Sequence, residues 1–123
     1  MNASQLSELL RSNVVELTFQ RRRPNNRGSF RRMLCTMNES ILNSVNGRTV
    51  LNYLPPAGFN KTYNPVQKNL ALAWDILVQD FRMISAESVS IQQTYNTDEE
   101  FWNYFNANII PMSSAEKAAY MNQ

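Results

Sequence analysis

The sequence of 123 residues contains no histidine and a single cysteine, Cys35. Without histidine, the commonest general base, the serine-type triad and most zinc sites are excluded. One cysteine excludes an intramolecular disulfide and a cysteine-rich metal site, and it is typical of a reducing cytoplasm. No apolar run approaches the roughly 18 residues that would span a bilayer, and the polar N-terminal segment lacks the pattern of a secretory signal. We therefore expect a cytoplasmic protein without membrane contact.

Motifs of common enzymes are also missing. Neither a GxxxxGK[ST] nor a GxGxxG phosphate loop occurs in the sequence. Asp75 and Asp80 flank an expected turn, and the acidic residues 98–100 are explained by helix capping. Cys35 lies in a predicted strand without a histidine to activate it, so we interpret it as a structural thiol. We expect no enzyme activity, no cofactor and no metal.

Hydrophobic residues make up 43% of the chain, enough for the core of one domain. The formal net charge of +2 hides an asymmetry between two parts of the sequence. Residues 1–93 hold eleven Lys/Arg against six Asp/Glu, whereas residues 94–123 hold one lysine against four Asp/Glu. A basic body followed by an acidic segment predicts two surfaces with different roles.

The first half of the sequence predicts a helix followed by a hairpin. Leu6, Leu9 and Leu10 form an apolar stripe at helical spacing over residues 4–12. Residues 14–20 then alternate apolar and polar side chains, which is typical of a half-buried strand with Glu16 on the solvent face. Residues 24–28 read Pro-Asn-Asn-Arg-Gly, a turn cluster, and a second strand is predicted over residues 29–37.

The second half predicts three more strands and two helices. A short helical turn is expected over residues 39–45, ended by Asn46-Gly47, and residues 46–69 show no periodicity. Strands are predicted over residues 70–76, 81–85 and 88–92. Capping boxes at 97–100 and 113–116 then open two helices, which Pro111 separates.

These elements predict a mainly β fold. Five short strands in this length favour a small SH3- or Sm-like barrel, which buries one face of every strand and leaves few free edges. We expect residues 1–93 to form this barrel, with an N-terminal helix and a long loop insertion at 46–69. Residues 94–123 are expected to be a helical C-terminal extension that packs on the barrel.

The order of these segments resembles a known family. The Leu-rich helix at 6–10, the strand at 14–19, the Arg-Arg-Met-Leu-Cys-Thr-Met-Asn run at 31–38 and the pieces at 74–75 and 81–89 resemble small phage-encoded proteins with a WYL-like, Sm-type SH3 β-barrel. The resemblance covers roughly residues 4–92 and implies the barrel fold and a phage origin. The turn between the first two strands is longer and richer in arginine than the family's, and the insertion is longer and richer in aromatics, so the resemblance implies little about function.

Arginine is the strongest candidate for a binding role. Nine of the twelve basic residues are arginine, and six of them lie within residues 19–32. Arginine is favoured where bidentate phosphate contacts are made, and an anionic partner would relieve the mutual repulsion of six guanidinium groups. The alternative is a solvated hairpin tip whose charge blocks strand-to-strand aggregation. The candidate residues are Arg21, Arg22, Arg23, Arg27, Arg31 and Arg32.

Three aromatic residues in the insertion complete the candidate site: Tyr53, Phe59 and Tyr63. Aromatic rings beside arginine are suited to stacking on single-stranded bases, at about 1–3 kcal/mol per base. The alternative is that they hold the loop against the barrel. Trp102 and Phe105 of the acidic segment likewise either dock onto the barrel or face a partner.

Two classes of function remain open. The first is a phage accessory protein that binds DNA or RNA through the arginine-rich hairpin, in transcription or in handling of nucleic acid, with mainly phosphate contacts. The second is a protein-interaction module that binds an acidic host protein such as a polymerase or nuclease. The sequence does not decide the oligomeric state, and pairing of edge strands into a ring is a third possibility.

Overall fold

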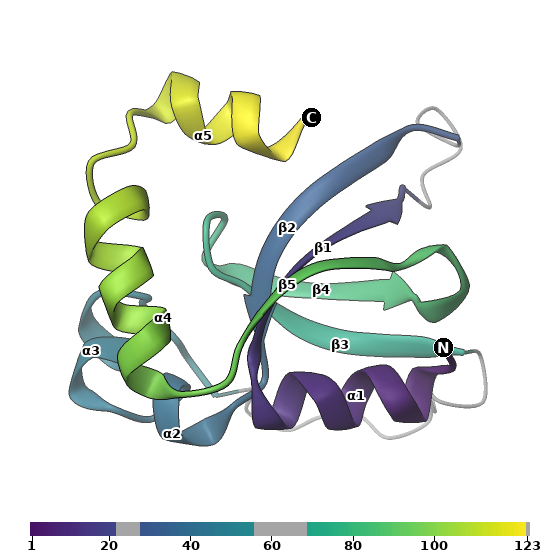
Figure 1. Cartoon of the computed structure of the whole chain (residues 1–123), viewed down its shortest axis with the longest axis horizontal. Coiled ribbons are helices and arrows are strands. Elements are labelled where there is room, and N and C mark those ends of the chain that lie inside the picture. Colours follow the sequence, from purple (N-terminus) through teal and green to yellow (C-terminus); the bar gives the residue numbers. More distant parts are fainter. Residues whose placement is uncertain (22–27, 56–68, 123) are drawn as a thin grey trace.

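The computed structural model describes residues 1–21, 28–55 and 69–122. Its centre is an antiparallel sheet of five strands in the order β4-β3-β2-β1-β5, with helices on both sides (Figure 1). The strands are β1 (Val14–Gln20), β2 (Phe30–Thr36), β3 (Leu70–Asp75), β4 (Asp80–Ser85) and β5 (Ser90–Tyr95). The helices are α1 (Ala3–Ser12), α2 (Glu39–Leu42), α3 (Val45–Thr49), α4 (Asp98–Tyr104) and α5 (Ser114–Met121).

The expectation of a mainly β protein is too strong. Among the described residues 41% are helical and 31% lie in strands, because α3, which was not predicted, adds to the helices that the sequence indicated. A five-stranded antiparallel sheet with an N-terminal helix is confirmed. In the described part of the chain no ladder pairs β4 with β5, so the sheet is open.

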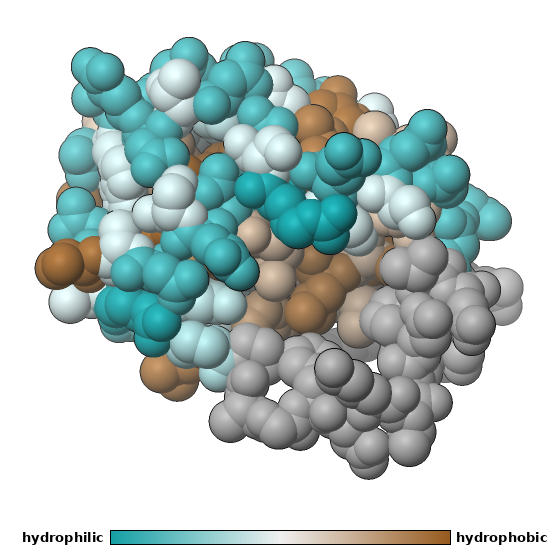
Figure 2. Space-filling view, turned by 90° about the horizontal axis from the view of Figure 1, so that it is seen from below, coloured by the Kyte–Doolittle hydropathy of each residue, from teal (hydrophilic) through white to brown (hydrophobic). Residues whose placement is uncertain are grey.

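The predicted N-terminal helix is confirmed as α1. Asn2 caps it through a capping box with Gln5, and the buried Leu6 and Leu10 face the sheet. They join a core cluster with Val15, Leu17 and other side chains from one face of the strands. The side of the molecule that carries α1 and α2, seen in Figure 2, is covered mostly by hydrophilic residues. No helix in the described ranges combines the length and apolar character needed to cross a bilayer.

The hairpin of β1 and β2 is confirmed, but β1 is buried on both faces rather than half-buried. Val15 and Leu17 face the α1 side, while Val14 and Glu16 face the C-terminal helices and are also buried. The second face is covered because Leu34, Phe101, Phe105 and further side chains form a second core cluster on that side of the sheet. The polar alternation of the strand therefore does not mark a solvent face.

The insertion begins with a second helix that sequence patterns did not predict. Asn46-Gly47 was expected to end the helical turn, yet both residues lie inside α3, which Ser44 caps. Gly47 is buried, and a Cβ atom there would overlap the carbonyl oxygens of Ile41 and Leu42. Glycine is needed here because two short helices approach closely, and not because a helix stops.

Replacing Gly47 with alanine should therefore destabilise the protein by about 1–3 kcal/mol, the cost of forcing extra volume into a packed site. The midpoint of a urea unfolding transition would show the shift. Asn46→Ala is the matched control, because this neighbour on α3 is exposed and its removal should change little. Equal stability of Gly47→Ala and wild type would contradict the close approach of α2 and α3.

The last three strands differ from the prediction at their ends. β3 and β4 are confirmed, but residues 86–88 form a 3-10 turn (η3) and the last strand runs from Ser90 to Tyr95 instead of 88–92. A flat sheet of five strands would place its two edge strands about 19 Å apart. Ser85 and Ser90 are nevertheless joined by a short connection that includes the compact η3 turn. The sheet must therefore curl strongly so that its two edges approach each other.

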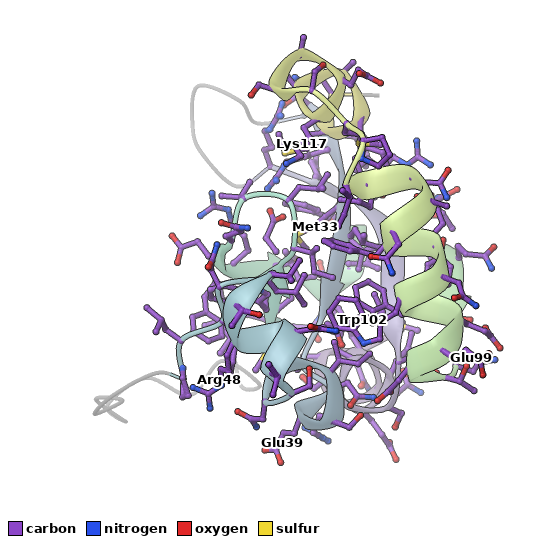
Figure 3. All side chains as sticks on the ribbon, turned by 90° about the vertical axis from the view of Figure 1, so that its left-hand side faces the viewer. Met33, Glu39, Arg48, Glu99, Trp102 and Lys117 are labelled. Atoms are coloured by element: carbon purple, nitrogen blue, oxygen red, sulfur yellow. The ribbon has the colours of Figure 1, made fainter. Side chains whose placement is uncertain are left out.

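The predicted C-terminal helices are confirmed in outline and pack on the sheet. Thr97 caps α4, a π-helical turn (η4, Phe105–Ile109) extends it, and Ser113 and Glu116 form the capping box of α5. Phe101, Phe105 and Ile109 are buried in the second cluster. Figure 3 shows Trp102 on the inner side of α4 and Glu99 pointing outward.

Candidate functional site

The predicted site residues fall into three groups. Arg22, Arg23, Arg27, Phe59 and Tyr63 lie outside the described residues. Arg21 lies at the described end of the hairpin, which extends past the other strands in Figure 1. The remaining predicted residues are Arg31, Arg32 and Tyr53, and all three make contacts within the protein.

Arg31 is buried and forms an ion pair inside the protein. Its Nη2 atom donates to Oδ2 of Asp75 at 2.5 Å, and its residue is 8% exposed. The guanidinium also lies 5.8 Å from the centroid of the Phe19 ring. Oδ1 of Asp75 accepts the backbone N–H groups of Leu77 and Val78, each at 3.2 Å, so one carboxylate holds both the arginine and the β3–β4 turn. In this arrangement Arg31 does not face an external anion.

Arg32 belongs to a second ion pair, on the opposite face of the sheet. Its Nη2 donates to Oε1 of Glu16 at 2.6 Å, and its Cζ lies 4.2 Å from the centroid of the Tyr120 ring. The Tyr120 hydroxyl donates to the other oxygen of Glu16 at 2.8 Å. Glu16 is thereby satisfied at both oxygens although it is only 6% exposed. Helix α5 supplies Tyr120, so it completes this polar cluster.

Arg21 is the described hairpin arginine nearest the tip. Its backbone N–H donates to the Ser29 carbonyl at 2.9 Å, which continues the β1–β2 ladder by one step. Its Nη2 donates to Oδ1 of Asn122 at 2.8 Å, an exposed contact. Consecutive residues at the end of α5 thus contact three hairpin arginines, since Met121 Sδ accepts from Arg31 at 3.1 Å and Tyr120 stacks on Arg32.

Tyr53 packs in the protein rather than presenting a ring to solvent. It is 8% exposed and makes edge contacts with Trp74 at 5.1 Å and Phe81 at 5.9 Å between ring centroids. Burial raises the pKa of its hydroxyl above the usual value. Of the two roles considered for this aromatic residue, the structure shows it holding the start of the insertion against β3 and β4.

Sequence patterns missed Phe30 as a surface residue. Phe30 lies on the same strand face as the buried Leu34, yet it is 54% exposed because the hairpin extends beyond the helices that cover Leu34. Phe30 pairs with Gln20, so it lies one residue away from Arg21 at the base of the arginine-rich tip. The sequence offered one indication of this exposure: Phe30 follows the turn cluster closely and is the first residue of its strand.

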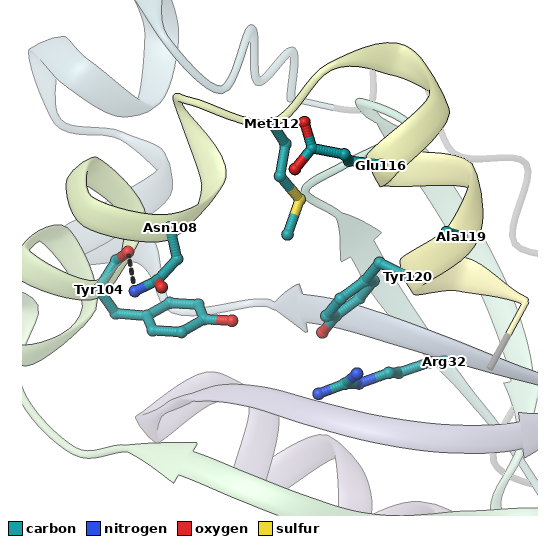
Figure 4. A pocket seen from close by; sticks show the side chains of 7 residues that line it. All are labelled: Arg32, Tyr104, Asn108, Met112, Glu116, Ala119 and Tyr120. Carbon is teal, nitrogen blue, oxygen red and sulfur yellow. Dashed lines mark hydrogen bonds between the residues drawn. The ribbon is translucent and has the colours of Figure 1, made fainter.

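A pocket lies beside the Glu16–Arg32 ion pair. It has a volume of about 510 Å³ and is bounded by β2, the end of α4 with η4, the following linker and α5 (Figure 4). Its lining residues are Arg32, Tyr104, Asn108, Met112, Glu116, Ala119 and Tyr120. None of them except Arg32 was predicted as a site residue.

Tyrosine hydroxyls gather around Glu16. The Tyr95 and Tyr104 rings lie with their centroids 4.8 Å apart, and the Tyr120 hydroxyl donates to Glu16 itself. Burial and then the neighbouring hydroxyl and carboxylate raise the pKa of Tyr95, and burial with the Glu16 hydrogen bond raises that of Tyr120. These groups stay neutral near pH 7 and act as hydrogen-bond partners, not as bases.

The described residues contain no cluster of three potential metal ligands. Cys35 is buried in the α1-side core, and burial strongly raises the pKa of its thiol, so this thiol is not a nucleophile in the folded protein. Comparison of the chain with protein-family models, with curated proteins and with solved structures finds no match in any of the three.

Proposed function

We propose that this is a non-enzymatic protein that binds nucleic acid at the end of its β1–β2 hairpin. The observation that carries the proposal is the exposed Phe30 side chain, which lies one residue from Arg21 in the hairpin register; the sequence between β1 and β2 contains three further arginines. Guanidinium groups contact phosphates, and an exposed aromatic ring offers a face to a base. The hairpin extends past the other strands, so it can reach a strand of nucleic acid without rearrangement of the sheet.

The internal ion pairs reduce the number of arginines assigned to the ligand. Arg31 and Arg32 neutralise Asp75 and Glu16, so their role is to stabilise the hairpin. Arg21, Arg22, Arg23 and Arg27 are left as phosphate contacts. With four such contacts, the slope of log K against log salt should lie between about −3 and −4, depending on whether the ligand is single- or double-stranded.

The finer assignment of the fold is part of the same proposal. The short connection between β4 and β5, the curl it imposes and the N-terminal helix support a small barrel-like sheet of the SH3 or Sm type. Such small sheets carry their binding residues on loops and hairpin ends. A phage accessory role in the cytoplasm, as the resemblance implies, is consistent with a single buried thiol.

A salt titration tests the function. We expect a labelled oligonucleotide to bind, with affinity falling steeply between about 50 and 200 mM salt. Arg22→Ser with Arg23→Ser should reduce the slope by about 1.5–2 and weaken binding at low salt, because two phosphate contacts are lost. The control is the double variant Arg11→Ser with Arg48→Ser. Both arginines are exposed, on α1 and α3, so their replacement removes the same charge from another part of the surface. Equal salt-dependence slopes for the two double variants would exclude the hairpin as the nucleic-acid binding site.

The acidic first turn of α4 favours one alternative, a protein-interaction module. Asp98, Glu99 and Glu100 are exposed there, while the described end of the β1–β2 hairpin lies at another end of the molecule. Because opposite charges attract across an interface, a partner protein would contact this acidic turn with a basic surface, whereas an acidic host protein would contact the hairpin arginines. Affinity capture from cells with and without nuclease separates the two functions, since a partner protein retained after nuclease treatment supports the module.

A further inference from the structure

The pocket beside the Glu16–Arg32 ion pair coincides with two backbone irregularities. The β1–β5 ladder shifts register between Glu16 and Leu17, which is a bulge, and the π-helical turn η4 follows Tyr104. Bulges and π-helical turns recur at functional sites, where they redirect side chains. Here the extra residue is Gln92 of β5, opposite the step from Glu16 to Leu17. Glu16 bonds to the pocket residues Arg32 and Tyr120, and η4 carries Asn108 at the pocket's rim.

The lining of the pocket suits a planar molecule with polar edges. Figure 4 shows the Tyr104 and Tyr120 hydroxyls directed toward each other, with the Met112 side chain entering from the linker and Arg32 beneath. Rings, a thioether and a guanidinium plane stack well on heteroaromatic rings. The volume of about 510 Å³ lies within the range that holds a small molecule of nucleoside size.

The rim of the pocket offers hydrogen-bond partners for amino and ring N–H groups. Glu116 and Asn108 are exposed residues of the lining. The Asn108 Nδ2 atom donates to the Tyr104 carbonyl at 3.1 Å, which fixes the orientation of the amide. A carboxylate accepts from amino groups of bases, and the charge of Arg32 is already balanced by Glu16. A neutral base with an amino group is therefore matched better than a free anion.

The pocket is continuous with the hairpin through the end of α5. Tyr120 lines the pocket, and Asn122, two residues later, accepts from the Arg21 side chain at 2.8 Å. Arg21 is therefore connected to the wall of the pocket through consecutive residues at the end of α5.

We propose that this pocket receives one unpaired, amino-bearing nucleobase of a single strand held at the hairpin. The inference rests on the proposed nucleic-acid function and makes it specific for single strands, because a base within a duplex cannot enter. The base stacks between the tyrosine and methionine side chains, and its amino group donates to Glu116 at the rim. Removing one base-stacking contact by alanine substitution typically weakens binding on the order of tenfold, so we expect loss of this site to change affinity by a similar factor.

The test fills the pocket without changing charge. Ala119 is exposed and lines the pocket, so Ala119→Leu should occupy the space, while Ala118→Leu on the same helix is exposed and lies outside the lining. Leucine is a good helix former, so both variants should keep α5 intact. The probes are AMP and CMP, followed by chemical-shift changes, and one labelled oligonucleotide as a single strand and as a duplex.

We expect both mononucleotides to bind wild type and the Ala118→Leu variant, and to bind Ala119→Leu at least tenfold more weakly. The preference for the single strand over the duplex should fall by a similar factor in Ala119→Leu only. If the oligonucleotide binds with its steep salt dependence while Ala119→Leu changes nothing, the pocket proposal is overturned and the hairpin function stands. If mononucleotide binding is lost in Ala119→Leu but no oligonucleotide binds, the hairpin function falls and the pocket remains a base site.

Discussion

Replacing Asp75 with alanine is expected to destabilise the protein by about 3–5 kcal/mol, because it leaves the buried Arg31 guanidinium without its counter-charge. Asp75 is 0% exposed and bonds to Arg31 at 2.5 Å. The same substitution removes the acceptor for the N–H groups of Leu77 and Val78. Urea unfolding followed by circular dichroism gives the free energy of unfolding.

Two further variants separate these effects. Asp75→Asn keeps an oxygen that can accept the N–H groups of the turn but loses the negative charge. Its free energy of unfolding should therefore exceed that of Asp75→Ala only by the contribution of the turn's hydrogen bonds. Asp80→Ala is the control, since Asp80 is exposed at the other end of the same turn and surface changes usually stay within about 0.5 kcal/mol. Combining Arg31→Met with Asp75→Asn should cost less than the sum of the single changes. Additive costs would mean that the two side chains do not depend on each other.

Phe101→Ala is expected to have a similarly large effect, about 3–5 kcal/mol, as found when a buried phenylalanine ring is removed. Phe101 is 0% exposed and lies in one cluster with Val14 and Leu34 of the sheet. Its ring also contacts those of Trp102 and Phe105, with centroids 4.8 and 5.6 Å apart. The loss should appear in the global unfolding transition, because the cluster joins α4 to the central hairpin.

The control for this prediction is Ile110→Ala, in the same helical region but 58% exposed. It should shift the free energy of unfolding by less than about 0.5 kcal/mol. A Phe101→Ala variant that unfolds at the wild-type midpoint, with only its near-ultraviolet signal altered, would show the helices after β5 to be a separately attached segment. Monitoring both the secondary structure and the aromatic signal distinguishes these results.

Local patterns in the sequence predicted where helices and strands form, but they predicted less well what surrounds each element in the fold. The alternation of residues 14–20 and the cap at Ser113 act over a few residues, and both β1 and α5 form as expected. The role of Gly47 was missed because its constraint comes from the carbonyl of Ile41, on the neighbouring helix. A Gly in a short helical stretch looks the same in sequence whether it ends a helix or lets another approach.

The candidate site shows the same limit more strongly. Arg31 and its partner Asp75 are 44 residues apart, and Tyr120 reaches Glu16 across 104 residues. Six clustered arginines therefore look alike in sequence although two of them neutralise buried carboxylates. The hairpin pairs Arg32 with Thr18, two residues from Glu16 on the same strand face, but nothing in the sequence pattern indicated that α5 would cover that pair.

The position of β1 has a consequence for the order in which the chain assembles. β1 pairs with β2, the next strand in the sequence, but its other edge pairs with β5, where Val14 meets Tyr95. Closing so long a stretch of chain costs entropy that only the completed contacts can repay. The β1–β2 hairpin can therefore form early in folding. Pairing of β1 with β5 requires almost the whole polypeptide, and the pocket forms after that step because α5 follows β5.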